Sequence, residues 1–344
     1  MKKKQFLDFS PSELEVEFLP QHLQDQNKYR IKQICQWIFQ SQKSSFLEMS
    51  NLPESFRSTL DENYSLRSLK IVKKEKSKDL TTKFTFETYD LKNFTAVLLP
   101  RTGYYSLCIS TQVGCAWKCQ FCASGLVPFD RNLSSGEVLD QIFLIQTSEN
   151  IKIRNVLFMG MGEPLANYSN LVKTIQWLVS PQGFKLNPAH VTLSTTGVVP
   201  QIKKIAKEHL RVNLALSLHS ADEKIRKKIM PVSSKFAIVD VLNACKIYQA
   251  ENNCDLTIEY ILLDGINDGL KDSQKLVQVL DSIRFKERPK VNLIPYNPIP
   301  TLPFKPSSEN TIQSFFKFLK NKDFIVHTRK PQGQDIGAAC GQLS

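Results

Sequence analysis

The sequence lacks the features that mark secreted and membrane proteins. No run among its 344 residues is long and apolar enough to cross a bilayer. The first residues, MKKKQFLDFS, are basic and are not followed by an apolar stretch like that of a secretory signal peptide. Hydrophobic residues make up 42% of the chain and aromatic residues 10%, which is typical of a globular and not of a disordered protein. We therefore expect a cytoplasmic protein without membrane attachment.

Histidine is scarce, with five residues, and none lies near the one cluster of cysteines. Four of the eight cysteines fall within residues 108–122, and Cys115, Cys119 and Cys122 have the spacing C-x3-C-x2-C. A disulfide framework does not suit a cytoplasmic chain, and three cysteines leave one thiol unpaired. A structural zinc site needs four ligands, usually in two separated pairs. Three thiolates on one loop favour a 4Fe–4S cluster whose fourth iron stays open to a small molecule, with zinc as the alternative.

Acidic residues are outnumbered, with 33 Asp and Glu against 45 Lys and Arg, so the formal net charge is +12. The basic residues are spread along the chain and do not form one patch in the sequence. Lysines on helix faces often only increase solubility. The excess is therefore compatible with a polyanionic partner such as nucleic acid, but it does not identify one.

Residues 1–75 are expected to form a small, mostly helical N-terminal domain. Apolar residues recur at helical spacing in KYRIKQICQWIFQSQ, and NLPESFRSTLDENYSL predicts a second short helix. Cys35 lies on the apolar stripe and is interpreted as a core residue. Residues 76–104 are rich in Thr, Phe and Val around a polar turn, which predicts a β-hairpin linking this domain to the next.

From about residue 105 to residue 330, short apolar segments alternate with segments of helical period. The segments are SLCIS, NVLFMG, HVTLST, VNLALSLH, LTIEYILL, KVNLIPY and FIVHTRK. This alternation predicts an α/β fold with a parallel sheet, and the near-continuous apolar strands fit burial on both faces. Ser134, three residues before Glu137, suits a capping box at the start of a helix.

Six successive candidate strands run into loops with unusual residues. These loops contain GCAWKC, MGMGEP, STTGVVP, LHSAD, LLDGINDG and IPYNPIP. Barrels of alternating strands and helices build their active sites from the loops at the carboxyl ends of the strands. The pattern therefore predicts a partial (β/α)6 barrel whose open side suits a bulky substrate. A Rossmann-like open sheet would also gather such loops at one edge and is the alternative.

These motifs together resemble a known family. CISTQVGCAWKCQFCASG, with an aromatic residue before the last cysteine, is similar to the cluster motif of the radical S-adenosylmethionine (radical SAM) superfamily. FMGMGEPLAN, LSTTGVVP, LSLHSADEKIRKKIMP, VNLIPYNP and DIGAACGQL, with the N-terminal YRIKQICQWIF, resemble the RlmN/Cfr family of 23S rRNA adenine methyltransferases. The resemblance covers nearly the whole chain.

The resemblance implies a set of binding residues. Cys115, Cys119 and Cys122 would bind one 4Fe–4S cluster. Gly162 and Glu163 would hold the amino and methionyl end of SAM. The residues that match the rest of the family's SAM pocket are Ser194, Ser217, Leu218, His219 and Asn297.

The resemblance also implies roles for two further cysteines. Cys340 would be methylated by one SAM, and a radical made from a second SAM would activate its methyl group for addition to the adenine. Cys108 would help to remove the ring proton and close a disulfide with Cys340, which releases the RNA. Residues 331–344 are Gly-rich and are expected to form a mobile tail carrying Cys340. Cys245 and Cys254 are interpreted as structural.

One position departs from the family pattern. Thr95 stands where much of the family has a glutamate that is proposed as a base. Either that glutamate is dispensable, or Glu87 or bulk water replaces it, or turnover is impaired. This departure supports one alternative, a non-catalytic iron–sulfur or zinc protein that binds RNA. A separate alternative is another radical SAM enzyme that acts on a small substrate and has no use for Cys340.

The motifs GMGEP and IPYNP resemble the type that methylates carbon 2, whereas the Cfr type, acting at carbon 8, tends to have GMGEA and an arginine at the position of Pro295. The resemblance implies 23S rRNA as partner, a flavodoxin- or ferredoxin-type electron donor and a monomer. Some members of the family also methylate a tRNA adenosine next to the anticodon, which the sequence leaves open.

Overall fold

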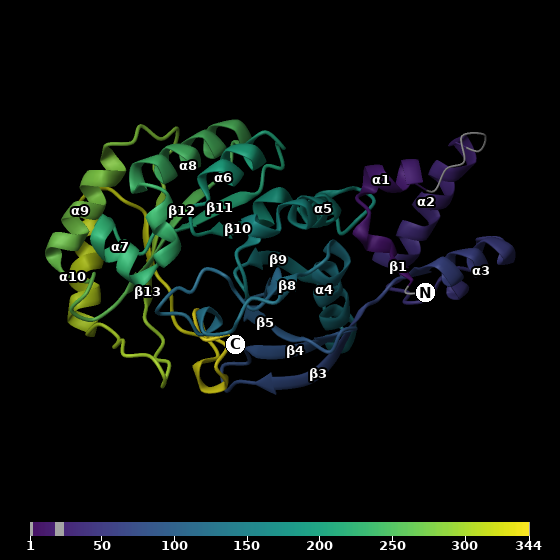
Figure 1. The fold of residues 1–344 in the computed structure, drawn as a ribbon, viewed down its shortest axis with the longest axis horizontal. Coiled ribbons are helices and arrows are strands. Elements are labelled where there is room, and N and C mark those ends of the chain that lie inside the picture. The colour runs from purple at the N-terminus through teal and green to yellow at the C-terminus, as the bar shows by residue number, and fades with distance from the viewer. Residues whose placement is uncertain (1–2, 18–23, 344) are drawn as a thin grey trace.

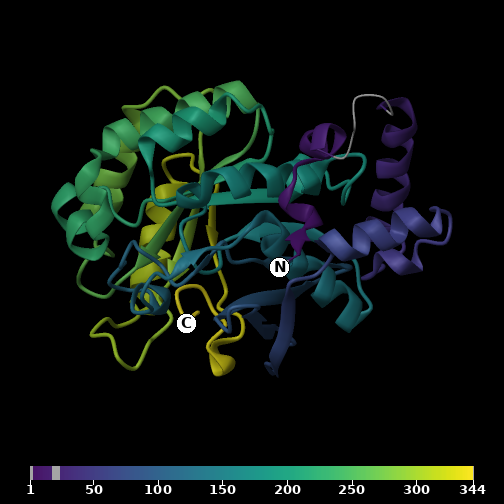
Figure 2. The ribbon, with the colours of Figure 1, turned by 45° about the vertical axis from the view of Figure 1, so that its right-hand side comes forward.

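The computed structural model describes residues 3–17 and 24–343 and is built around one ten-stranded sheet (Figures 1 and 2). Seven neighbouring strands are parallel, and each coincides with an apolar segment of the sequence. They are β6 (Tyr104–Cys108), β9 (Ile153–Phe158), β10 (Val191–Thr195), β11 (Asn213–Ser217), β12 (Leu256–Leu262), β13 (Lys290–Pro295) and β14 (Val326–Thr328). The predicted α/β fold class is confirmed.

Helices connect the parallel strands and cover the outside of the curved sheet (Figure 1). They are α4 (Ser135–Glu149), α5 (Tyr168–Val179), α6 (Val199–Ala206), α7 (Glu223–Ile229), α8 (Ile238–Asn252), α9 (Leu270–Asp281) and α10 (Glu309–Lys320). In β11, Leu214, Ala215 and Leu216 are completely buried, as expected for a strand covered on both faces. β14 and β6 do not pair, so the parallel strands form a partial barrel of six strand–helix units and a last strand.

Three antiparallel strands continue the sheet beyond β6. β3 (Leu69–Lys76), β4 (Thr82–Thr88) and β5 (Asn93–Arg101) follow in the sheet order β6-β5-β4-β3. The hairpin of β4 and β5 was predicted. Two points differ from the sequence expectation: β3 ends a segment expected to be mostly helical, and the hairpin pairs on both sides, so it belongs to the central sheet. β3 forms because its segment, LKIVKKEK, pairs with β4 and keeps most of its polar residues exposed at the edge of the sheet.

The N-terminal segment forms helices that lie to one side of the sheet (Figures 1 and 2). They are α1 (Pro11–Glu17), α2 (Gln24–Phe39) and α3 (Glu54–Asn63), with β1 (Lys4–Gln5) pairing with β2 (Tyr64–Ser65). Ile31, Ile34, Cys35 and Ile38 of α2 are buried, and burial raises the pKa of the Cys35 thiol to about 12. The helical spacing and the structural interpretation of Cys35 are confirmed. In the described ranges, no helix combines the length and apolarity that crossing a membrane requires.

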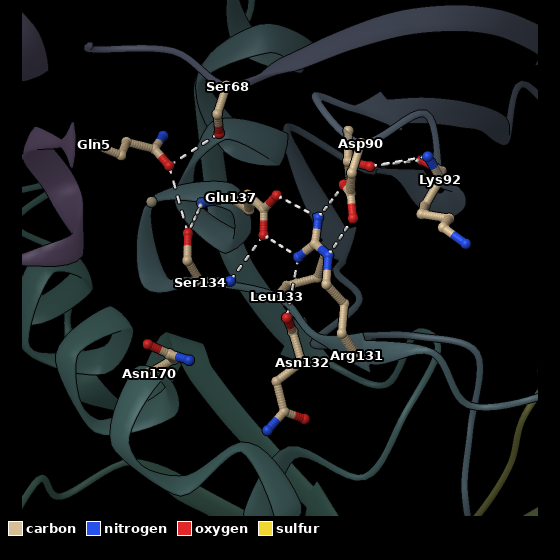
Figure 3. A network of polar contacts seen from close by, with 12 residues as sticks. Gln5, Ser68, Asp90, Lys92, Arg131, Asn132, Leu133, Ser134, Glu137 and Asn170 are labelled. Carbon is tan, nitrogen blue, oxygen red and sulfur yellow. Dashed lines mark hydrogen bonds and ion pairs between the residues drawn. The ribbon is translucent and has the colours of Figure 1, made fainter. Parts of the chain in front are cut away.

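Polar contacts fix the start of α4 against the hairpin and the N-terminal segment (Figure 3). Ser134 accepts from the Glu137 backbone N–H, and the Glu137 carboxylate accepts from the Ser134 backbone N–H, which is the predicted capping box. Arg131 forms paired hydrogen bonds with Asp90, in the β4–β5 turn, and with Glu137. Gln5 accepts from the Ser68 hydroxyl at 2.9 Å. The polar residues at this junction are thus satisfied by one another.

Candidate active site

The loop with the three cysteines leaves the end of β6 and is closed by a short ribbon. β7 (Gln112–Val113) pairs with β8 (Arg131–Asn132), so residues 114–130 form a loop with fixed ends. Inside it, the Cys122 backbone N–H donates to the Cys119 carbonyl at 3.2 Å, and the Gly125 N–H donates to the Cys122 carbonyl at 3.0 Å. Gly125 lies so close that a Cβ there would be 2.6 Å from the Cys119 carbonyl oxygen. This tight turn presents the cysteines to one side.

Cys115, Cys119 and Cys122 line one pocket, of about 170 Å³. Burial raises the pKa of each of the three thiols, to about 11 for Cys115 and well above its usual value for Cys119, where charge on the other two adds to the effect. Three thiolates close to one another in a buried site need positive charge to be stable. Among residues 3–17 and 24–343, no three His, Cys or acidic side chains are grouped to hold a single metal ion. A 4Fe–4S cluster makes a different demand, because each cysteine binds its own iron.

Gly162 and Glu163, in the loop after β9, also line this pocket. Gly162 has a φ of +96°, and a Cβ there would be 2.5 Å from the Gln112 side chain, so the position requires glycine. The buried Glu163 carboxylate accepts from the Thr196 backbone N–H and hydroxyl, both at 2.8 Å. Burial raises the pKa of Glu163, while the bonds from Thr196 oppose the rise. The carboxylate is therefore held in a fixed orientation at the pocket.

The next strands bring Ser194, Ser217 and His219 to the same pocket. The hydroxyls of Ser194 and Ser217 lie 3.5 Å apart at the ends of β10 and β11. His219 follows β11 with a φ of +58°, and its Nδ1 accepts from the Ile261 backbone N–H at 3.1 Å. Burial, together with the charge of Arg226, lowers the pKa of His219 to about 3, so the imidazole is neutral.

Two of the residues expected to bind SAM, Leu218 and Asn297, are not among the residues that line this pocket. Leu218 is completely buried, and its backbone N–H donates to the Leu216 and Glu259 carbonyls. Asn297 lines the neighbouring cavity and contacts the C-terminal segment: its Nδ2 donates to the Cys340 carbonyl at 2.9 Å, and its Oδ1 accepts from Gln334 at 2.7 Å. The sequence motif predicted their proximity to the site and not their contacts.

Cys108 and Cys340 face this neighbouring cavity, which has a volume of about 810 Å³. Both are free thiols, and burial raises the pKa of Cys108 to about 12. Cys340 also lines the pocket of the three cysteines, so it lies on the boundary between the two sites. The structure therefore brings together five cysteines that are up to 232 positions apart in the sequence.

An ion pair between a buried carboxylate and a half-buried guanidinium also lies at this boundary. Arg329, after β14, donates to Glu259 of β12 at 2.7 Å, and Asn292 donates to the same carboxylate oxygen at 3.0 Å. Burial lowers the pKa of Arg329. Negative charge on Glu259, Cys340 and Cys108 outweighs this effect, so the pKa of Arg329 is raised overall. The site thus holds a guanidinium close to both thiols.

Comparisons with known proteins agree with this geometry. Residues 109–277 match the Radical SAM superfamily, and residues 4–66 match the ribosomal RNA large subunit methyltransferase N-terminal domain. The chain is 43% identical to a probable dual-specificity RNA methyltransferase RlmN of Endomicrobium trichonymphae, over 99% of this chain and 97% of the relative. It is 36% identical to the dual-specificity RNA methyltransferase RlmN of Nautilia profundicola, over 100% of this chain and 98% of the relative.

The chain belongs to the RlmN family of radical SAM methyltransferases. A crystal structure of a radical SAM methyltransferase from Sphaerobacter thermophilus has the same fold, with a TM-score of 0.89, 32% identity and 99% of both chains covered. The resemblance inferred from the motifs is confirmed. Membership of the radical SAM superfamily implies a 4Fe–4S cluster and SAM, and the pocket fits them: three half-buried cysteines, a glycine turn and a buried carboxylate line it together.

Thr95 is the position at which the sequence departs from the pattern expected from the resemblance. The residue is buried on β5, its hydroxyl has no hydrogen-bond partner among the residues that the structure describes, and its carbonyl accepts from the Ser110 hydroxyl. Cys108 pairs with Val97, two residues further along β5, and neither Thr95 nor Glu87 lines the cavity of the two thiols. Among the described residues that line this cavity, Asp79 is the one with a carboxylate. It accepts hydrogen bonds from the backbone N–H groups of Thr81 and Gly333.

Arg329 and Glu259 were missed by sequence reasoning about this RlmN-family site. Glu259 is the one acidic residue in the apolar segment LTIEYILL, and a charge inside a buried strand indicates a partner. The sequence therefore indicated that Glu259 has a charged partner. It did not identify Arg329 as that partner, because the two residues are 70 positions apart.

Proposed function

We propose that this protein methylates carbon 2 of an adenosine in 23S rRNA through a methylated Cys340 and a covalent protein–RNA adduct. The observation that supports this most is the position of Cys340. It lies next to the pocket that suits the cluster and SAM, and it shares the larger cavity with Cys108. A cysteine between two reactive sites suits a carrier of a one-carbon group.

The pocket residues would hold the cofactors. Cys115, Cys119 and Cys122 would bind the cluster, and Gly162 and Glu163, with Ser194, Ser217 and His219, would orient SAM. When bound, the reduced cluster would cleave SAM to methionine and a 5′-deoxyadenosyl radical. The neutral imidazole of His219 adds no positive charge beside a cationic cofactor. Two SAM molecules would be used per turnover, one as methyl donor and one as radical source.

Cys340 and Cys108 would act in sequence. Carbon 2 of adenine is not nucleophilic, so it cannot accept a methyl cation directly. The Cys340 sulfur instead accepts the methyl group first, and after hydrogen abstraction its methylene group bonds to the ring. The adduct radical would then lose one electron, which the cluster would take up, and, with the help of Cys108, the ring proton. Cys108 forms a disulfide with Cys340 as the carbon–sulfur bond breaks, and the one-carbon group keeps the electron pair of that bond and takes up a proton to become methyl. A covalent intermediate of this kind divides one prohibitive step into several accessible ones.

Carbon 2 is favoured over the carbon 8 of Cfr-type enzymes by two prolines. Pro164 follows Glu163 in GMGEP and lines the cofactor pocket. Pro295 is the first proline of IPYNP and lines the larger cavity. Cfr-type sequences tend to have arginine at this position. Because proline replaces that arginine, this position adds neither a positive charge nor a long side chain to the wall of the cavity.

The proposed substrate is structured RNA, bound mainly through phosphates by the excess of basic residues. The relatives are named dual-specificity RNA methyltransferases, and we extend the proposal to a tRNA adenosine next to the anticodon. The target base would leave its stack to enter the 810 Å³ cavity. We assign RNA binding to residues 1–75 and catalysis to the barrel, and we expect a cytoplasmic monomer reduced by a flavodoxin- or ferredoxin-type donor.

Nucleoside analysis of rRNA and tRNA from cells with and without this gene tests the proposal. Loss of 2-methyladenosine from 23S rRNA is expected, whereas loss of 8-methyladenosine would assign the Cfr-type reaction. Cys340→Ala should abolish methylation, Cys108→Ala should accumulate a protein–RNA crosslink, and Cys254→Ala, a half-buried cysteine outside both sites, should retain activity. A Cys108→Ala protein without any crosslink would contradict the assigned roles.

Thr95 favours a second candidate function, an RNA-binding iron–sulfur protein that has lost turnover. The anaerobically reconstituted protein would then bind iron without producing 5′-deoxyadenosine. Production of 5′-deoxyadenosine and methylated RNA would reject this candidate. Restoring the family glutamate by Thr95→Glu should increase turnover if the missing base limits the rate.

A further inference from the structure

The C-terminal segment 331–343 is held on both sides of Cys340. Figure 1 shows this segment (yellow) next to β3 and β4, and β3 and β14 are the two ends of the strand order of the sheet. The contacts before Cys340 are made with the turn between β3 and β4, residues 77–81. The contacts after Cys340 are made with the loop of the three cysteines.

The contacts with the β3–β4 turn are reciprocal. Asp335 accepts from the Ser77 hydroxyl at 2.6 Å and from the Lys78 backbone N–H at 3.3 Å. In the opposite direction, Asp79 accepts from the Gly333 backbone N–H at 2.9 Å. Each segment therefore supplies one carboxylate that binds a backbone N–H of the other, and charged acceptors make the stronger hydrogen bonds.

Glycine and lysine complete this contact. Gly333 has a φ of +67°, and a Cβ there would lie 2.8 Å from the Thr81 side chain, so only glycine allows this approach. Lys83 of β4 donates to the Ile336 carbonyl at 2.5 Å, and Glu75 of β3 pairs with Lys83 at 3.3 Å. Lys83 and Cys108 both pair with Val97, so these contacts lie one strand away from the site.

On the other side of Cys340, the segment joins the cysteine loop. The Ala123 backbone N–H, directly after Cys122, donates to the Gly341 carbonyl at 2.7 Å. The Ser124 hydroxyl donates to the Leu343 carbonyl at 2.5 Å. Cys340 is thus the exposed residue of a short stretch between two attachment points.

We propose that Asp335 and Asp79 form a clasp that docks the C-terminal segment on the β3–β4 turn and are positioning residues for Cys340. The antiparallel strands β3–β5 lie outside the parallel strands of the barrel. The proposal gives β3 and β4 a role, because they carry the docking site for the C-terminal segment. The docking does not depend on catalysis, whereas its consequence for methyl transfer rests on the proposed function of Cys340.

Hydrogen–deuterium exchange of the full-length protein tests the clasp. In wild-type protein the backbone N–H groups of Gly333, Ile336 and Ala338 are hydrogen-bonded and should exchange slowly. Asp335→Ala should speed exchange in the peptide covering residues 331–343 about tenfold, since a hydrogen bond to a charged group is lost. Unchanged exchange would overturn the proposal.

A double-mutant cycle separates the clasp from general destabilisation. Ser77→Ala should also speed exchange, and the Ser77→Ala/Asp335→Ala protein should match Asp335→Ala alone, because both changes remove one contact. Fully additive effects would contradict direct pairing. Asp323→Asn is the matched control: this exposed aspartate lies before β14, at the opposite edge of the sheet, and should leave exchange of residues 331–343 unchanged.

A second measurement tests positioning. With methyl-labelled SAM, Asp335→Ala should transfer the label to Cys340 about tenfold more slowly than wild type, and Asp335→Asn, which retains an acceptor oxygen, should recover part of the rate. Equal rates in all three proteins would refute the positioning role. If wild-type Cys340 receives no label at all, the proposed function fails, while the exchange experiment still decides whether the clasp exists.

Discussion

Gly125→Ala is predicted to disrupt the cluster-binding loop without removing any cysteine. The added Cβ would lie 2.6 Å from the Cys119 carbonyl oxygen and 3.0 Å from the Cys119 nitrogen. Ordinary contact begins near 3.4 Å, so the Cys119 backbone has to move by roughly 0.8 Å. Overpacking of this kind costs about 1–3 kcal/mol. Because Cys119 is hydrogen-bonded to Cys122, the shift changes the geometry of two proposed ligands at once.

The expected result is a decrease of about 10- to 100-fold in iron affinity, the size of effect that supporting residues have at metal sites. Iron and sulfide content after anaerobic reconstitution, with the absorbance and EPR signal of the cluster, measure it. Gly269→Ala is the matched control, because its Cβ approaches only a flexible Asp272 side chain at 3.2 Å. A Gly125→Ala protein with full iron content and an unchanged EPR signal would refute the account of this loop.

Three further predictions concern buried charges. Asp140→Ala leaves Arg67 without its buried carboxylate partner and should lower the free energy of unfolding by about 3–5 kcal/mol; a urea midpoint equal to wild type would contradict this. His219 is kept neutral in the fold, with a pKa of about 3, so protonation below pH 6.5 favours the unfolded chain. The unfolding free energy should fall as pH decreases from about 6.5 toward 3, and His219→Asn should reduce this slope in urea titrations at several pH values. Glu259→Leu removes the carboxylate that compensates Arg329, so calorimetry should show affinity for cationic SAM falling about tenfold and affinity for neutral S-adenosylhomocysteine falling less.

The repeating units of this fold could be predicted from the sequence because they are locally determined. The apolar run in VNLALSLH predicts a buried strand without knowledge of its neighbours, and the capping box of Ser134 and Glu137 lies within four residues. The cysteine triplet is likewise local. Since the carboxyl ends of parallel strands meet at one edge, the order of the motifs also placed Glu163, Ser194 and His219 in one pocket.

The remaining features depend on contacts between distant residues. LKIVKKEK has no clear alternation, and it becomes β3 only because β4 pairs with it. Asn297 binds the Cys340 carbonyl because the chain returns across the sheet after β14, which no local pattern indicates. The ion pair of Glu259 and Arg329 and the contact of Asp335 with Ser77 likewise join residues 70 and 258 positions apart.

The position of Cys340 limits how far it has to move. The Gly-rich sequence predicts a mobile tail that carries the methyl group between two sites. In the structure, Cys340 already lines both sites, and the segment is attached at Gly333 and Asp335 before it and at Gly341 after it. Gly337 and Gly341 have φ values of +61° and +84°, conformations that glycine adopts without strain. Local rotation of residues 337–340 between fixed ends can therefore serve both proposed steps, and such a short segment loses less conformational entropy on each return than a free tail would.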